Sequence, residues 1–263
     1  MGLNLEHLPR ARNYPQTGNR SACVFDALGE KTRTQPAALR FKTQDPMIID
    51  TIEGCKIRLE DGLEGEKVTF VADADIDADG ANGQNDARAA YKADDSGSEA
   101  LANGGMGIRH GEVVGIADWF KDIVVVENGK PKIFPGGVIV SKTAYHVRGE
   151  QEDTPKRYID SATVPYVVVP PVIIQKTKGV VRGCFARVTY KGNSVDCMIG
   201  DVGPRKKIGE ISIAAARAVG MPSSPRSGGE DKKIVRYEIF PGRKATINGV
   251  TYPLMRSDGT YVD

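Results

Sequence analysis

Short runs of apolar residues, separated by turn-forming residues, follow one another along most of this chain. Val and Ile are concentrated in these runs, and 30 Gly and 15 Pro divide them. This spacing is typical of β-rich structure. We expect strands at residues 47–52, 56–59, 67–72, 123–126, 132–134, 138–141, 164–170, 180–190, 195–199 and 234–240.

Three polar segments between these runs predict hairpin turns: Glu127–Lys130, Lys191–Ser194 and Asn248-Gly249. Each supplies Gly or Asn, residues that adopt the positive φ of tight hairpins. The apolar stretch 113–126 contains the single Trp119 and fits either a strand pair or a short helix. A lone Trp in such a run is more often a core residue than a sugar platform.

One segment has a helical period. Ile208, Ile211, Ala215 and Ala218 share a face, and Gly220 stands where a C-terminal cap belongs, which predicts a helix over 208–219. We therefore expect a mainly β or α+β fold, a barrel-like mixed sheet with one main helix. Residues 1–45 have no sustained period and predict an irregular arm, whereas 46–263 predict one domain with a basic C-terminal extension.

The formal net charge of +2 argues against a nucleic-acid or other polyanion binder that relies on bulk charge. The near balance combines two opposed regions. Residues 61–100 carry 11 acidic and 3 basic side chains, whereas residues 174–263 carry 16 basic and 8 acidic ones. The acidic region suits a cationic ligand, and the basic region suits an anionic wall or partner.

The chain starts without an apolar signal-peptide core, and no run approaches the roughly 18 apolar residues of a membrane span. We expect no membrane span, no Sec signal and synthesis in the cytoplasm, with non-Sec export or delivery to a cell wall left open. Cys23, Cys55, Cys184 and Cys197 show no metal-binding spacing with the three His, so we expect no zinc site and no cofactor. Buried free thiols are the expected state of Cys184 and Cys197, although a bond between adjacent strands is the alternative.

Two carboxylates stand out near the predicted helix. Asp201 follows an apolar strand, and Glu210 comes nine residues later, in the expected first turns of the helix. A strand end and a helix start can face one cleft, and two carboxyls there can serve as general acid and general base. The structural alternative is that Asp201 forms the turn and Glu210 is an ordinary first-turn acid.

A second acidic motif, Asp73, Asp75, Asp77 and Asp79, alternates with other residues before Gly80. If the preceding strand continues, these carboxylates share one face, and a cation would relieve their repulsion. One candidate is Ca²⁺, because Asp75, Asp77, Asp79 and Asp86 fall at ligand positions of an EF-hand-like loop. A substrate ammonium is another, and by composition the whole stretch 73–106 is expected to be a solvated loop.

Four blocks together are similar to one enzyme family. They are residues 73–80, 138–145 (VIVSKTAY), 157–169 (RYIDSATVPYVVV) and 200–216 (GDVGPRKKIGEISIAAA), and in this order they resemble glycoside hydrolase family 75, the chitosanases. The resemblance implies an inverting mechanism with Asp201 and Glu210 as the catalytic pair. We assign Glu210 as general acid and Asp201 as base, and the exchange of these roles stays open. The resemblance also implies that Asp73, Asp75, Asp77 and Asp79 line the substrate cleft. Tyr145 and Tyr166 are candidates to bind substrate there, and a structural role is the alternative that we favour for each of the two tyrosines.

The leading hypothesis is an endo-acting glycosidase that cleaves β-1,4-linked aminosugar polymers such as chitosan. The resemblance leaves open a muramidase-like enzyme for peptidoglycan, delivered by a phage or a secretion system. A non-catalytic module that binds carbohydrate, cell wall or calcium is the alternative of a different class. The sequence does not predict an oligomeric state.

Overall fold

The computed structural model describes residues 45–62, 64–151 and 153–262, so the expected arm lies outside the described residues up to residue 44. Eight strands form the main sheet: β1 Met47–Ile52, β2 Cys55–Gly62, β3 Gly65–Asp77, β10 Tyr166–Val169, β11 Cys184–Tyr190, β12 Asn193–Val202, β13 Glu210–Ser212 and β14 Glu230–Lys244. They are ordered β1-β2-β3-β13-β10-β12-β11-β14.

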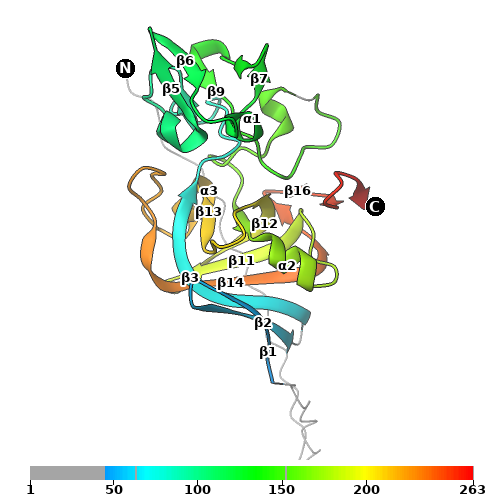
Figure 1. Ribbon diagram of the computed structural model, residues 1–263. Helices are drawn as coiled ribbons and strands as arrows, with labels where there is room; N and C mark the ends of the chain where they lie inside the picture. The colour runs from blue at the N-terminus through cyan, green and yellow to red at the C-terminus, as the bar shows by residue number, and fades with distance from the viewer. Residues whose placement is uncertain (1–44, 63, 152, 263) are drawn as a thin grey trace, which may run out of the picture. The chain divides into compact units, whose positions relative to one another are not determined.

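Six of these strands close into a barrel, because β14 pairs with β3 as well as with β11. The strand pairs β3–β13 and β10–β12 are parallel and the other pairs in the ring are antiparallel. The barrel-like mixed sheet predicted from the sequence is therefore confirmed. Figure 1 shows β1 and β2 continuing the sheet beyond β3.

Alternation along β3 divides its side chains between the two faces of the barrel wall. Phe70, Ala72, Ala74 and Ile76 are buried in the main core, which also takes residues of β10, β12 and β13. The side chains between them, including Asp73, Asp75 and Asp77, stand on the outer face. The expectation of a loop over residues 73–106 was wrong for residues 73–77, where hydrogen bonding to β13 and β14 outweighs the turn-forming composition. Beyond Asp77 most of this stretch is turn or irregular structure, as expected.

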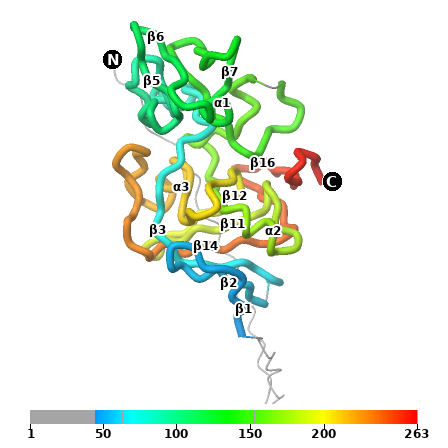
Figure 2. Tube along the Cα trace, in the orientation of Figure 1, coloured from blue at the N-terminus to red at the C-terminus, as the bar shows by residue number. Residues whose placement is uncertain are grey.

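Residues 78–165 connect β3 to β10 through short elements. These are β4 Tyr91–Lys92, η1 Leu101–Gly104, β5 Met106–Arg109, β6 Glu112–Gly115, α1 Phe120–Ile123, β7 Val126–Glu127, β8 Lys130–Pro131, η2 Pro135–Gly137, β9 Val138–Ile139 and η3 Pro155–Arg157. Figure 2 shows the chain leaving β3 directly into this segment, drawn in green. The strands expected at 123–126 and 132–134 are observed as the shorter β7 and β8, and α1 takes the start of the first expected strand.

The predicted helix over 208–219 is only half helical. Glu210–Ser212 form β13, and α3 spans Ile213–Ala218, with the Ser212 hydroxyl accepting a hydrogen bond from the Ala215 amide at 3.1 Å. The first residues are held as a strand because β3 and β10 pair with them on both sides. Because α2, Pro171–Lys176, is equally long, the single main helix that we expected is absent from the described chain.

Three hairpin turns are confirmed. Asn128-Gly129, Lys191-Gly192 and Asn248-Gly249 each have two consecutive positive φ angles, between 47° and 86°, as the tightest hairpins require. The last of them joins β15 Thr246–Ile247 to β16 Val250–Thr251, and β17 Leu254–Met255 pairs with β18 Tyr261–Val262 nearer the end.

Other expectations have mixed outcomes. Trp119 is 47% exposed, so the expectation of a core residue was wrong. Cys184 and Cys197 are buried free thiols, as expected. Among the helices of the described residues, none has the length and apolar character needed to cross a membrane.

Gly209 lies between the β12–β13 loop and β13, and its backbone requires glycine. Its φ is +93°, and a Cβ there would lie 2.6 Å from the Asp73 Oδ1 and 2.7 Å from the Asp73 carbonyl oxygen. We expect Gly209→Ala to lower the free energy of unfolding by about 3 kcal/mol, because strain and overlap add. Gly249→Ala is the matched control, since its φ is also positive but its Cβ meets open space. It should cost about 1 kcal/mol in the same urea titration, and equal losses would contradict the account.

Candidate active site

Asp201 and Glu210 lie on either side of one residue of β10. Val168 pairs with Asp201 of β12 on one side and with Glu210 of β13 on the other. Asp75 of β3 is the next residue in the same row, paired with Glu210. Two strand spacings separate the Cα atoms of Asp201 and Glu210, a distance of about 9.5 Å. The two residues singled out in the sequence are thus brought together across the sheet rather than at a helix start.

Asp201 is buried, and backbone groups hold its carboxylate. The amides of Ala144 and Val202 both donate to Oδ1 at 2.7 Å. Burial raises the pKa of Asp201 to about 8, and the negative charge of Asp77 adds to this effect. The two amides and the positive charge of Arg182 act in the opposite direction. Asp201 therefore keeps its proton near neutral pH, although the two amides and Arg182 stabilise the carboxylate once the proton has left.

Glu210 is half-buried, at the edge of a small hollow that it shares with Asp75, Val168, Lys207 and Gly209. Burial raises the pKa of Glu210 well above its usual range, and the charges of Asp77 and Asp201 raise it further. No group among the described residues donates a hydrogen bond to this carboxyl. Its ionised form has the charge of Lys207 nearby but lacks hydrogen bonds such as those that the amides give Asp201.

Asp77 and Asp79 complete the acidic cluster. Carboxylate oxygens of Asp77, Asp79 and Asp201 all lie within 4.8 Å of one another. The Asp79 amide donates to Asp77 Oδ1 at 2.7 Å, and the Tyr166 hydroxyl lies 2.9 Å from Asp77 Oδ2. Burial raises the pKa of Asp77 to about 6, although these hydrogen bonds hold it down, and it raises the pKa of Asp79 well above its usual range.

Glu99 is a further member that the sequence reading did not single out. Burial raises its pKa to about 7, and Asp77 contributes to the shift. Its backbone carbonyl accepts a hydrogen bond from Arg226 at 3.1 Å, and Arg226 also binds the carbonyls of Asp95 and Gly97. Nothing in the local sequence SGSEAL distinguishes Glu99 from a solvated acid.

Asp73 and Asp75 stand on the same face but point elsewhere. Asp73 Oδ1 is buried without a hydrogen-bond partner among the described residues, and it faces the backbone of Gly209. Asp75 is exposed and forms an ion pair with Lys207 at 3.1 Å. The alternation therefore does place Asp73, Asp75 and Asp77 on one face, but only Asp77 joins the cluster with Asp79 and Asp201.

Tyr145 and Tyr166, the candidates for substrate binding, leave no ring face for a sugar. Tyr145 is 1% exposed, donates to the Pro253 carbonyl at 3.1 Å and packs edge-on against Tyr252 and Tyr261. Tyr166 is fully buried beneath Asp77. Tyr166 supports the cluster by its hydrogen bond to Asp77, whereas Tyr145 is a core residue of the neighbouring hydrophobic cluster.

The EF-hand-like arrangement is not formed. Asp75 and Asp77 belong to a β-strand, and the carboxylate of Asp86 pairs with Arg217 at 2.8 Å. The calcium ligands expected from spacing alone, Asp75, Asp77, Asp79 and Asp86, therefore do not converge. The carboxylates that do converge are those of Asp77, Asp79 and Asp201.

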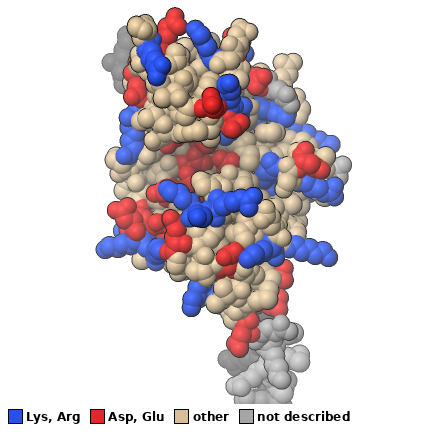
Figure 3. Space-filling view, viewed as in Figure 1, with Lys and Arg blue, Asp and Glu red and all other residues tan. Residues whose placement is uncertain are grey.

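Figure 3 shows acidic side chains in a hollow of the surface, with Lys and Arg side chains gathered along one side of it. A scan of protein-family models finds no match to this sequence, and a search of curated proteins finds none either. The candidate site therefore depends on its geometry and on the sequence resemblance.

The raised pKa of Asp201 makes stability depend on pH. Between about pH 4 and about pH 8 the folded protein retains a proton that the unfolded chain releases, so stability falls as pH rises through this window. Asp201→Asn cannot titrate, and its amide oxygen can still accept the two backbone hydrogen bonds. We expect this variant to melt about 3 °C or more above the wild type at pH 8, with a smaller difference at pH 4.

Differential scanning calorimetry at both pH values measures this effect. Asp118→Asn, which removes an exposed carboxyl, is the matched control for the loss of one charge. A melting difference for Asp201→Asn that is the same at both pH values, or larger at pH 4, would contradict the burial argument.

Proposed function

We propose that this protein is an endo-acting glycoside hydrolase that cleaves β-1,4-linked aminosugar polymers. The observation that carries the proposal is the pairing of Asp201 and Glu210 with the same residue, Val168, on one outer face of the barrel. Hydrolysis of a glycosidic bond needs one protonated and one ionised carboxyl across the scissile bond. The resemblance of four sequence blocks to family 75 supports the same pair.

Glu210 is the general acid in this proposal, and Asp201 is the base. Burial and negative neighbours raise the pKa of Glu210, and no described group donates a hydrogen bond to its carboxyl. Glu210 therefore holds its proton and can pass it to the leaving oxygen. Asp201 has two amide donors and the charge of Arg182, which stabilise its carboxylate, so the base is the ionised fraction of Asp201, a fraction that grows as the pH rises towards about 8. Their Cα atoms are two strand spacings apart, about 9.5 Å. The inverting mechanism that we propose requires the carboxyl groups themselves to be about 6.5–9.5 Å apart, so that a water fits between base and sugar.

Removing either carboxyl should abolish cleavage. We expect Asp201→Asn and Glu210→Gln each to lower kcat by at least about 100-fold on chitosan or peptidoglycan, because each loses a proton-transfer group. Mass analysis of the released oligosaccharides measures the rate and identifies the bond cleaved. Asp118→Asn should retain full activity, and survival of cleavage in both single variants would refute the assignment.

A divalent-cation site is the second candidate, favoured by the convergence of Asp77, Asp79 and Asp201 within 4.8 Å. Carboxylates are the ligands that Ca²⁺ and Mg²⁺ prefer. In the glycosidase proposal, protons and hydrogen bonds neutralise this cluster instead. Millimolar Ca²⁺, Mg²⁺ or EDTA should then leave the melting temperature of dialysed protein unchanged. A metal-dependent rise that disappears in Asp201→Asn would favour the cation site.

A further inference from the structure

We propose that a groove beside Asp201 binds carboxylate-bearing substituents of the glycan. The groove is lined by Arg182, Arg205 and Lys206. The preferred polymer is then anionic, of the peptidoglycan type, rather than polycationic chitosan. This inference rests on the proposed glycosidase function and names the substrate class of the same site.

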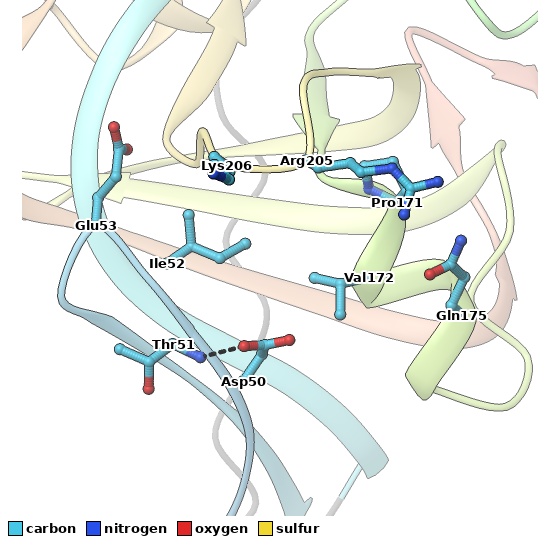
Figure 4. A pocket seen from close by; sticks show the side chains of 9 residues that line it. All are labelled: Asp50, Thr51, Ile52, Glu53, Pro171, Val172, Gln175, Arg205 and Lys206. Atoms are coloured by element: carbon cyan, nitrogen blue, oxygen red, sulfur yellow. Dashed lines mark hydrogen bonds between the residues drawn. The ribbon is translucent and has the colours of Figure 1, made fainter.

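The groove consists of two adjoining pockets on either side of the first turn of α2. The larger, about 540 Å³, lies between the β1–β2 turn, α2 and the β12–β13 loop, and the smaller is about 210 Å³. Both are lined by Pro171 and Gln175, so we treat them as one feature, the cationic groove. Figure 4 shows the larger pocket, with Arg205 beside Pro171 and Gln175.

Three cations of this groove, Arg182, Arg205 and Lys206, form no close ion pair with a carboxylate of the described residues. Arg182 is only 9% exposed, yet its guanidinium donates to backbone carbonyls, those of Ala144 at 2.5 Å and of Arg256. The charge of this buried arginine also acts on the carboxyl of Asp201, so Arg182 connects the groove to the proposed reaction centre. Arg205 and Lys206 are exposed and form no ion pair in the described part of the chain.

The acids near the groove do not cancel these charges. Asp50 is already paired with Lys176 at 2.8 Å. Glu53 is the remaining carboxylate of the lining, and Figure 4 shows it on the side of Lys206, at the opposite end of the pocket from Arg205. The groove therefore presents a surplus of positive charge, with arginine guanidinium groups that suit carboxylate recognition.

The cationic groove is continuous with the proposed reaction centre. Ala144 and Val202 line its smaller pocket, and their amides are the two that donate to Asp201. Arg205 and Lys206 belong to the loop that joins the strand of Asp201 to the strand of Glu210. A sugar bound across the two carboxyls would have its substituents within reach of this groove.

The acidic side of the site has little charge to offer a polycation. Asp75 is neutralised by Lys207, and Asp77 is bonded to Tyr166 and to the Asp79 amide. Burial also raises the pKa of Asp201 to about 8 and that of Asp79 well above its usual range, which lowers the negative charge of the cluster near neutral pH. The cations of the groove are thus the unpaired charges that a substrate meets, and they attract carboxylates and repel ammonium groups.

Cosedimentation with purified peptidoglycan sacculi tests the groove without requiring cleavage. We expect wild-type protein to bind native sacculi about tenfold more tightly than sacculi whose carboxyls have been converted to amides. The double variant Arg205→Ala/Lys206→Ala should lose this preference, whereas Arg109→Ala/Lys232→Ala, which removes two exposed cations elsewhere, should keep it. Equal binding of the wild type to native and amidated sacculi would overturn the inference.

Cleavage assays separate this inference from the proposed function. The Arg205/Lys206 variant should lose about tenfold in kcat/KM on peptidoglycan and keep the wild-type value on uncharged N-acetylglucosamine oligomers. Equal losses on both substrates, or faster wild-type turnover of chitosan than of peptidoglycan, would refute the anionic preference while the glycosidase stands. If the wild type cleaves none of these glycans, the proposed function fails, and the cosedimentation result alone decides whether the groove binds carboxylates.

Discussion

Crowding of carboxyl groups on one wall of a closed barrel is the constraint on which the rest of this structure depends. Asp77, Asp79 and Asp201 lie within 4.8 Å of one another, and Glu210 is close enough for their charge to raise its pKa. Buried carboxyl groups that lie this close to one another cannot all be ionised at once. The fold meets the cost with protons, with the Tyr166 hydroxyl and with backbone amides, and the resulting division between protonated and ionised carboxyls is what acid–base chemistry needs.

The barrel makes this crowding possible because its strands bring distant residues into one row. Asp75, Glu210, Val168 and Asp201 come from four strands and are neighbours only through their pairing register. Core side chains such as Ala74 and Ile76 fix which residues of β3 face outward, so a shift by one residue would bury the acids in the core. Gly209 permits the close approach of the loop that carries Lys206 and Lys207.

Much of this could be predicted from the sequence. Alternation and turn chemistry indicated the β-rich fold and the three hairpins, and they marked Asp201, Glu210 and the alternating aspartates. The rest depends on long-range pairing. Glu210 has the sequence environment of a first-turn helix residue, yet pairing with Asp75 and Val168 makes it part of a strand. Arg182 and Glu99 have no local signal, because their significance comes from segments more than fifteen residues away.

The central claim is that burial keeps part of this carboxyl cluster protonated near neutral pH. Carbon-13 NMR titration of the Asp and Glu side-chain carboxyls measures this directly, with Asp201→Asn used to assign the resonance. The account predicts carboxyls that titrate above pH 6, among them one near pH 8 that disappears in the variant. If every carboxyl of the folded protein titrates below about pH 5, as ordinary exposed acids do, the account is contradicted.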